Sequence, residues 1–235
     1  LLIANIAVFL VQSICRLVWK HNPLIPVFGL VPDMVFRQGY VWQVVTYAFL
    51  HGDLLHILFN MLFLYWFGCD VEALLGTGRF LLVYMGAVVV GAAVQAVVYI
   101  AGAANIVLLG ASGGVMGVLV FYAMCWPYRT IFFMLLFPMR MRTFALLTVA
   151  IDLYVAVFNP YGGVGALAHL GGAGFGFVFW RFQHRLDKAL RGYALHRQSA
   201  QRRRMVQDEE ALDRVLQKVH ERGVHTLTRD RKSVV

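Results

Sequence analysis

Hydrophobic residues occur along this chain in six long stretches, separated by shorter segments that hold most of the polar residues. A helix needs roughly 20 mostly apolar residues to cross a membrane, with a range of about 17–25. The pattern therefore predicts an all-α polytopic membrane protein, a bundle of six transmembrane helices. We expect these helices over about residues 1–19, 50–68, 79–100, 111–126, 142–158 and 164–182.

Two apolar segments depart from this regular pattern. The fourth stretch, 111–126, has about 16 residues, which at ~1.5 Å per residue give ~24 Å, less than the ~30 Å of a hydrocarbon core. Its first residues are therefore expected to lie below the membrane surface. The segment 129–141 is also apolar, but Arg129, Arg140 and Arg142 flank it, so we expect an interfacial loop and not a seventh span.

Composition and charge divide the chain into two parts. Only 14% of its residues are charged, against about 25% in soluble domains. Residues 1–182 hold 13 charged side chains and residues 183–235 hold 20, of which 13 are Lys or Arg. We expect a membrane domain over 1–182 and a basic tail over 183–235, with a short amphipathic helix at 209–223. The tail does not interleave aromatic with basic residues, so its charge favours anionic lipid headgroups over nucleic acid.

The positions of Lys and Arg predict how the spans are oriented. Basic residues gather in the connection 127–141 and at the start of the tail, and fewer flank the other side. The positive-inside rule then places the N-terminus and the tail in the cytoplasm. The connection 20–49 becomes an external loop, rich in Pro, Gly and aromatic residues and long enough to carry short interfacial helices.

Four strongly polar side chains lie within the predicted spans, where such groups are costly and need a reason. His56 and Asn60 are four residues apart on one face of the second helix. Ser112 begins the short fourth helix, and His169 lies about five residues into the sixth. All three helices start outside, so these side chains are expected at a similar depth in the outer half of the bilayer. The sequence predicts that they converge on one buried site.

Each of these residues also has a purely structural interpretation. A serine in a span often bonds to a carbonyl of its own helix, and a His–Asn pair can link helices through hydrogen bonds. The pairs Gly113/Gly117 and Gly172/Gly176 have the G-x-x-x-G spacing that lets two membrane helices approach closely.

A transporter or proton relay is a further alternative; it predicts acidic partners or an inverted repeat, and the sequence shows neither.

A serine and a histidine together are the minimum for an activated nucleophile. The imidazole takes the hydroxyl proton and later returns it to the leaving amine. Ser112 and His169 can fill these two roles. The tetrahedral oxyanion then needs hydrogen-bond donors, which Asn60, His56 and the backbone N–H of Ser112 can supply.

Glycines and the scarcity of acids narrow this chemistry further. Gly110 and Gly113 let the segment around the serine come close to a peptide, and Gly172 and Gly176 let the sixth helix press His169 toward it. The chain has no H-E-x-x-H and no C-x-x-C, so we expect neither a metal nor another cofactor. Asp152 is the one acid well inside a predicted span, so a pair of aspartates is not available, and we expect no acid to orient the histidine.

Three motifs in this order resemble those of the rhomboid intramembrane serine proteases. They are H-x4-H-x3-N over residues 51–60, G-x-S-G over 110–113 and A-H-x-x-G-x-x-x-G over 168–176, and the resemblance covers roughly residues 1–185. Each motif is common by itself, but the combination on the second, fourth and sixth helices is specific.

The resemblance implies a role for each motif residue. Ser112 corresponds to the family nucleophile and His169 to its general base. His56 and Asn60 match the oxyanion residues, and His51 matches a supporting histidine. The loop 20–49 matches the family's membrane-embedded first loop.

The resemblance also implies an activity and a location. We expect a metal-independent endopeptidase of the compact six-span bacterial form, in the inner membrane, that cleaves transmembrane segments entering past the span 142–158. The loop 159–165 is Gly-rich and is expected to act as a cap over the site. Many family members carry Trp-Arg in the first loop, whereas this chain has Trp42 and Gln43. A rhomboid-like protein that binds spans without cleaving them is the alternative; such relatives are expected to lack the serine or the histidine.

Overall fold

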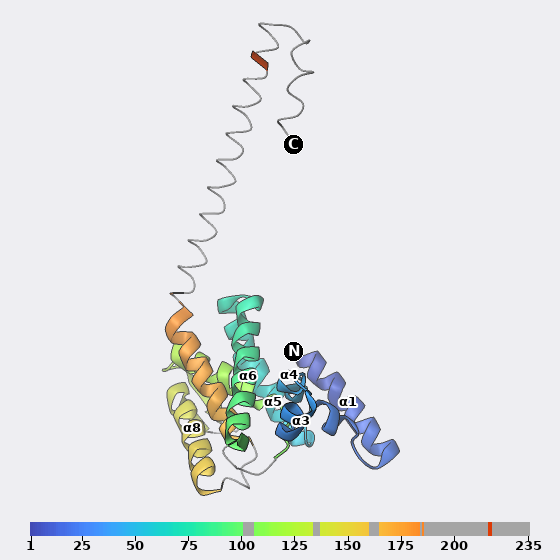
Figure 1. Ribbon diagram of the computed structural model, residues 1–235. Helices are drawn as coiled ribbons and strands as arrows, with labels where there is room; N and C mark the ends of the chain where they lie inside the picture. Colours follow the sequence, from blue (N-terminus) through green and yellow to red (C-terminus); the bar gives the residue numbers. More distant parts are fainter. Residues whose placement is uncertain (101–105, 134–136, 160–164, 184, 186–215, 218–235) are drawn as a thin grey trace. The chain divides into compact units, whose positions relative to one another are not determined.

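Figure 1 shows the computed structural model of the chain, which describes residues 1–100, 106–133, 137–159, 165–183, 185 and 216–217. The chain divides into two compact units, Leu1–Arg181 and Phe182–Val235. The amphipathic helix expected at 209–223 and the cap expected at 159–165 fall almost entirely outside the described residues. Both stay predictions.

Each of the six predicted stretches forms a helix. In the part of the chain that the structure describes, four helices are long and apolar enough to cross a membrane, and α7, with 14 residues, is shorter. The all-α fold is confirmed, whereas the count of six spans stays a prediction. The helices are α1 (Leu2–Trp19), α5 (Leu54–Leu75), α6 (Thr77–Ile100), α7 (Ser112–Cys125), α8 (Met141–Phe158) and one over residues 166–183.

Helix α7 lies at the centre of the bundle. Eleven of its fourteen residues are buried, among them the bulky Phe121 and Tyr122. Figure 1 shows α6, α8 and the helix over 166–183 running alongside one another, with α1 set apart beyond the short helices α3 and α4. At ~1.5 Å per residue α7 is about 21 Å long, which is less than a ~30 Å hydrocarbon core. The expectation that its first residue lies below the membrane surface stays a prediction.

The connection between α1 and α5 folds into short helices, as its length predicts. They are α2 (Leu24–Phe28), α3 (Pro32–Gln38), α4 (Gln43–Thr46) and the 3-10 helix η1 (Tyr47–Phe49).

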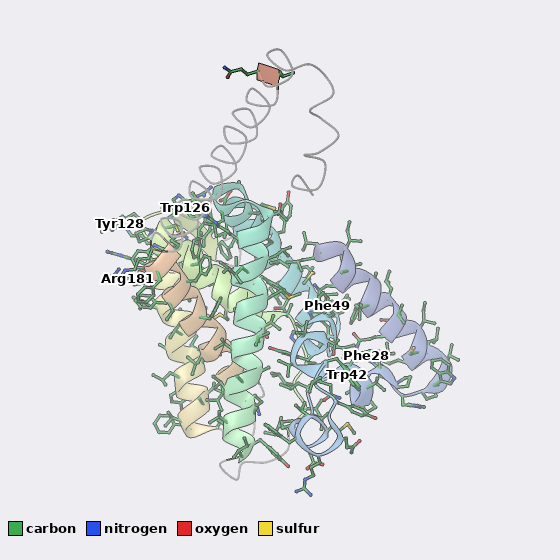
Figure 2. All side chains as sticks on the ribbon, turned by 45° about the horizontal axis from the view of Figure 1, so that its top comes forward. Phe28, Trp42, Phe49, Trp126, Tyr128 and Arg181 are labelled. Carbon is green, nitrogen blue, oxygen red and sulfur yellow. The ribbon has the colours of Figure 1, made fainter. Side chains whose placement is uncertain are left out.

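Trp42 and Gln43 form hydrogen bonds to other residues of this connection. Gln43 is fully buried; its amide nitrogen donates to the carbonyl of Pro26 at 2.9 Å, and its amide oxygen accepts from the N–H of Val31 at 3.0 Å. The indole of Trp42 donates to the carbonyl of Val27 at 2.9 Å. Figure 2 shows Trp42 near Phe28 and Phe49, on the side of the bundle where α1 lies.

Two short strands form within the segment 129–141, which the sequence did not predict. Strands β1 (Thr130–Phe133) and β2 (Phe137–Arg140) pair antiparallel, with Thr130 opposite Arg140. The segment is short of a span, as expected, but β-branched and aromatic residues favour a strand over an irregular loop. At the same end of the bundle lie Trp126, Tyr128 and Arg181 (Figure 2).

Glycines bring α7 and the helix over 166–183 into backbone contact. A Cβ atom on Gly172 would overlap the carbonyl oxygen of Gly113, and one on Gly176 would overlap that of Gly117. The two helices therefore touch over a full turn with no side chain between them. This contact is the one that the G-x-x-x-G spacing predicted.

Candidate active site

Ser112 is the first residue of α7, and the segment that leads to it is held by backbone hydrogen bonds. Leu108 pairs with Leu30 of the connection between α1 and α5 in both directions, at 2.9 and 3.0 Å. The N–H of Gly110 donates to the carbonyl of Tyr47 at 3.0 Å, and the Tyr47 hydroxyl donates to the carbonyl of Val88 in α6. The serine is thereby fixed relative to both α6 and the connection between α1 and α5.

His169 faces Ser112 from the helix over 166–183. Its Nε2 atom lies 2.7 Å from the Ser112 Oγ atom. These two residues are 57 positions apart in the chain, and the Gly113–Gly172 contact lies directly beside them. The structure thus brings the predicted nucleophile and the predicted base within hydrogen-bonding distance.

An acid does contact this histidine, which corrects the expectation that none would. The Asp152 Oδ1 atom of α8 lies 3.1 Å from the His169 Nδ1 atom. The sequence singled out Asp152 as an acid inside a span, but it did not show which face of α8 would meet the neighbouring helix. The cost of an ionisable group in a span is the signal that it needed a partner.

His56 approaches the serine from the other side. A Cβ atom on Gly110 would lie 2.6 Å from the His56 Nε2 atom and 3.6 Å from the Ser112 Oγ atom, so only a glycine leaves room for the ring. Gly110 also has a φ of +120°, which side chains rarely adopt. The backbone N–H of Gly52 donates to His56 Nδ1 at 3.4 Å. In the neutral ring the proton then sits on Nε2, which points into the site as a donor.

Asn60 lies one turn further along α5 and is buried. Its amide nitrogen donates to the carbonyl of His56 at 2.9 Å, which leaves its second N–H for another acceptor. His56 itself is placed at the start of the helix by Asp53, whose carboxylate accepts from the His56 N–H at 2.9 Å.

His51 supports His56 from behind. The two rings meet edge to face, with their centroids 5.1 Å apart. Gln12 of α1 holds the backbone of His51 in place: its amide oxygen accepts from the His51 N–H at 3.0 Å. Gln12, Gln43 and Tyr47 are anchors that the sequence analysis missed. Buried amides in an apolar segment are the available signal for the first two.

The remaining predicted residues lie around the site and not in it. Trp42 lies in the connection between α1 and α5, where its indole donates to Val27. Gly172 and Gly176 form the contact between the helix over 166–183 and α7. Among the described residues no group of three or more His, Cys, Asp or Glu side chains is placed to hold a metal ion.

The model of the rhomboid domain matches residues 38–185, which is more than half of the chain. The chain belongs to the rhomboid family. The match contains His51, His56, Asn60, Ser112 and His169 and includes the helix over 166–183. With its long apolar helices, this rhomboid protein is an integral membrane protein.

Several curated proteins are similar to parts of this chain. A stretch of 64 residues, 27% of the chain, is 39% identical to the rhomboid protease GluP of Bacillus subtilis and covers 13% of that protein. A stretch of 47 residues, 20% of the chain, is 43% identical to 17% of the rhomboid protease GlpG of Pectobacterium atrosepticum. A third, of 90 residues and 35% of the chain, is 30% identical to 28% of GlpG of an Enterobacter species. The matches therefore span less than a third of these relatives' lengths.

Proposed function

We propose that this chain is a serine endopeptidase that cleaves transmembrane segments of other membrane proteins within the bilayer. The observation that carries the proposal is the 2.7 Å distance between Ser112 Oγ and His169 Nε2. A packing serine would bond to its own helix; this one faces a base from another helix at the distance that general-base catalysis needs.

Acylation begins with the Ser112 hydroxyl. Its oxygen attacks the carbonyl carbon of the scissile peptide while its proton moves to His169 Nε2. The tetrahedral intermediate collapses as the C–N bond breaks, and the histidine gives the same proton to the leaving amine. The C-terminal fragment, which now begins with a free amine, leaves, and the N-terminal fragment stays bound to the serine as an ester.

Deacylation repeats these steps with water. His169 takes a proton from a water molecule, the hydroxide attacks the ester carbonyl, and the proton returns to Ser112 Oγ as the C–O bond breaks. The site must therefore admit water although it lies at membrane depth. Ser112 and His169 are both partly exposed, which is consistent with that requirement.

The oxyanion is stabilised by donors that surround the serine. The His56 Nε2–H group, the second amide N–H of Asn60 and the backbone N–H of Ser112 fill this role. Backbone N–H groups in the first turn of a helix have no partner within that helix, which makes the start of α7 a suitable donor. The tautomer set by Gly52 favours a donating Nε2 on His56.

The substrates are single-span or polytopic membrane proteins, and a substrate span must unwind locally to expose its peptide bonds. Residues with low helix propensity near the bond lower that cost. We further propose that both termini face the cytoplasm and that the protein resides in a bacterial inner membrane.

The test is cleavage of a generic single-span substrate by the purified full chain in liposomes. Ser112→Ala and His169→Ala are expected to abolish cleavage while leaving the thermal midpoint within a few degrees. Ser13→Ala and His21→Ala are matched controls, because Ser13 bonds to its own helix at Phe9 and His21 to the nearby Trp19 carbonyl. Both controls should cleave like the wild type, and EDTA should have no effect.

Two outcomes would contradict the proposal. Cleavage that survives in Ser112→Ala would place the chemistry elsewhere. A wild-type protein that binds the span without cleaving it would favour the catalytically silent binder.

A further inference from the structure

We propose that Asp152 is a positioning residue for His169, so that the catalytic unit has three members drawn from three helices. This inference rests on the proposed function and deepens it. It adds a residue that the serine–histidine pattern does not contain and that comes from α8, which contributes no motif residue.

The geometry forms a continuous chain of hydrogen bonds. Ser112 Oγ lies 2.7 Å from His169 Nε2, and His169 Nδ1 lies 3.1 Å from Asp152 Oδ1. The two ring nitrogens thus face one partner each. The side chains of His169 and Asp152 are 26% and 16% exposed, so water screens their interaction only in part.

The aspartate selects the tautomer that the reaction requires. A carboxylate can only accept a hydrogen bond, so the Nδ1 atom must carry the proton. The Nε2 atom of the neutral ring then has a free lone pair, which is the atom that takes the proton from Ser112. Without the carboxylate both tautomers are open to the ring, and the one with a proton on Nε2 is inactive as a base.

The aspartate also opposes the charge that develops on the ring. When Nε2 accepts the serine proton, the imidazole becomes a cation, and the carboxylate on the far nitrogen stabilises it. The proton itself does not pass to Asp152; it returns from Nε2 to the leaving amine. The proton transfers of acylation and deacylation are therefore the same with and without Asp152.

A purely structural ion pair between α8 and the neighbouring helix is the competing interpretation. It predicts that loss of the carboxylate lowers the stability and affects cleavage only through unfolding. A positioning residue predicts the reverse: the turnover rate falls while folding and substrate affinity change little.

The experiment compares Asp152→Asn with Thr148→Val in the liposome assay. Thr148 lies one turn before Asp152 on α8 and bonds to its own helix at Ala145, so it is the matched loss of a polar group. We expect Asp152→Asn to lower kcat by about 100-fold or more, with KM within about threefold. Thr148→Val should retain wild-type kcat. Equal kcat in Asp152→Asn and wild type, or a loss explained by a lower thermal midpoint, would overturn the inference.

A spectroscopic measurement separates this inference from the proposed function. In the Ser112→Ala protein with labelled histidine, the proton on His169 Nδ1 should give a strongly downfield NMR signal that disappears in the Ser112→Ala, Asp152→Asn double variant. If the wild type fails to cleave but the signal is present, the hydrogen bond stands and the protease assignment fails. If the wild type cleaves but the signal is absent, only the role of Asp152 fails.

Discussion

Gly110 has a backbone conformation and a neighbour that both exclude a side chain. Its φ of +120° is strained for any other residue, and the His56 ring occupies the space that a Cβ atom would need. The glycine therefore serves the site twice, by turning the chain into α7 and by admitting the imidazole beside the serine.

Replacing Gly110 with alanine should separate these two effects when a second glycine serves as the control. Gly39 has a φ of +74° and nothing within 4 Å of a Cβ atom, so Gly39→Ala suffers the strain alone. We expect both variants to lose about 1–3 kcal/mol of stability. Only Gly110→Ala should also lose cleavage, by about 100-fold, because it displaces an oxyanion donor. Equal cleavage by the two variants in the liposome assay would contradict the placement of His56.

Gln43 holds the connection between α1 and α5 in its folded conformation. Truncation to alanine removes the bond to the exposed Pro26 and leaves the buried Val31 N–H without its partner, and an unsatisfied buried group costs about 1–3 kcal/mol. We expect Gln43→Ala to lower the thermal midpoint measured in mild detergent, whereas Gln38→Ala, at the exposed end of α3, should leave it unchanged. An unaltered midpoint in Gln43→Ala would show that the connection is held by other contacts.

At the scale of the elements, the contact between α7 and the helix over 166–183 sets the distance between Ser112 and His169. Gly113 follows Ser112 directly, and Gly172 lies one turn after His169. Because these two glycines touch through their backbones, any side chain between them would push the nucleophile and the base apart. Helix packing and catalysis were alternatives for the segment around Ser112 in the sequence; on the proposed function, the packing of these glycines serves catalysis.

Gly172→Ala tests this contact, with Gly174→Ala as its control. A methyl group on Gly172 overlaps the Gly113 carbonyl oxygen, whereas one on Gly174 meets nothing within 4 Å. Alanine stabilises a helix by about 1 kcal/mol relative to glycine, so Gly174→Ala should be neutral or slightly stabilised. We expect Gly172→Ala to be destabilised by about 1–3 kcal/mol and to lose cleavage. A Gly172→Ala protein with wild-type stability, measured by thermal unfolding, would rule the contact out.

At the scale of the whole molecule, the hydropathy pattern carries most of the fold. Each apolar stretch became a helix because burial in lipid demands internal hydrogen bonds, and this constraint depends on composition and not on neighbours. The strand pair β1–β2 was not predicted, because an apolar segment shorter than a span is compatible with several backbone conformations. Only the pairing of the two strands decides among them.

Some residues of the candidate site could be predicted from the sequence and others could not. Ser112, His169 and His56 could be predicted because their depth follows from their position along each helix. Asp152 and Gln43 could not, because their partners depend on how a helix is rotated about its axis or how a loop closes. The hydropathy of α8 does not identify which neighbouring side chain Asp152 meets.

The contacts that hold helix α8 in the bundle are unevenly distributed along its length. All its residues are described, and the buried ones, Met141, Phe144 and Ala145, lie within its first turns. Asp152 is seven residues beyond Ala145, about 10 Å further along the axis, and there the helix is tied to His169. An outward tilt about the buried end would therefore stretch the Asp152–His169 bond and release the imidazole from its orientation. If substrates enter past α8, as the family resemblance implies, the proposed function predicts that opening of the bundle there and readiness of the base exclude each other. Admission of a substrate would then precede its cleavage as a separate event in time.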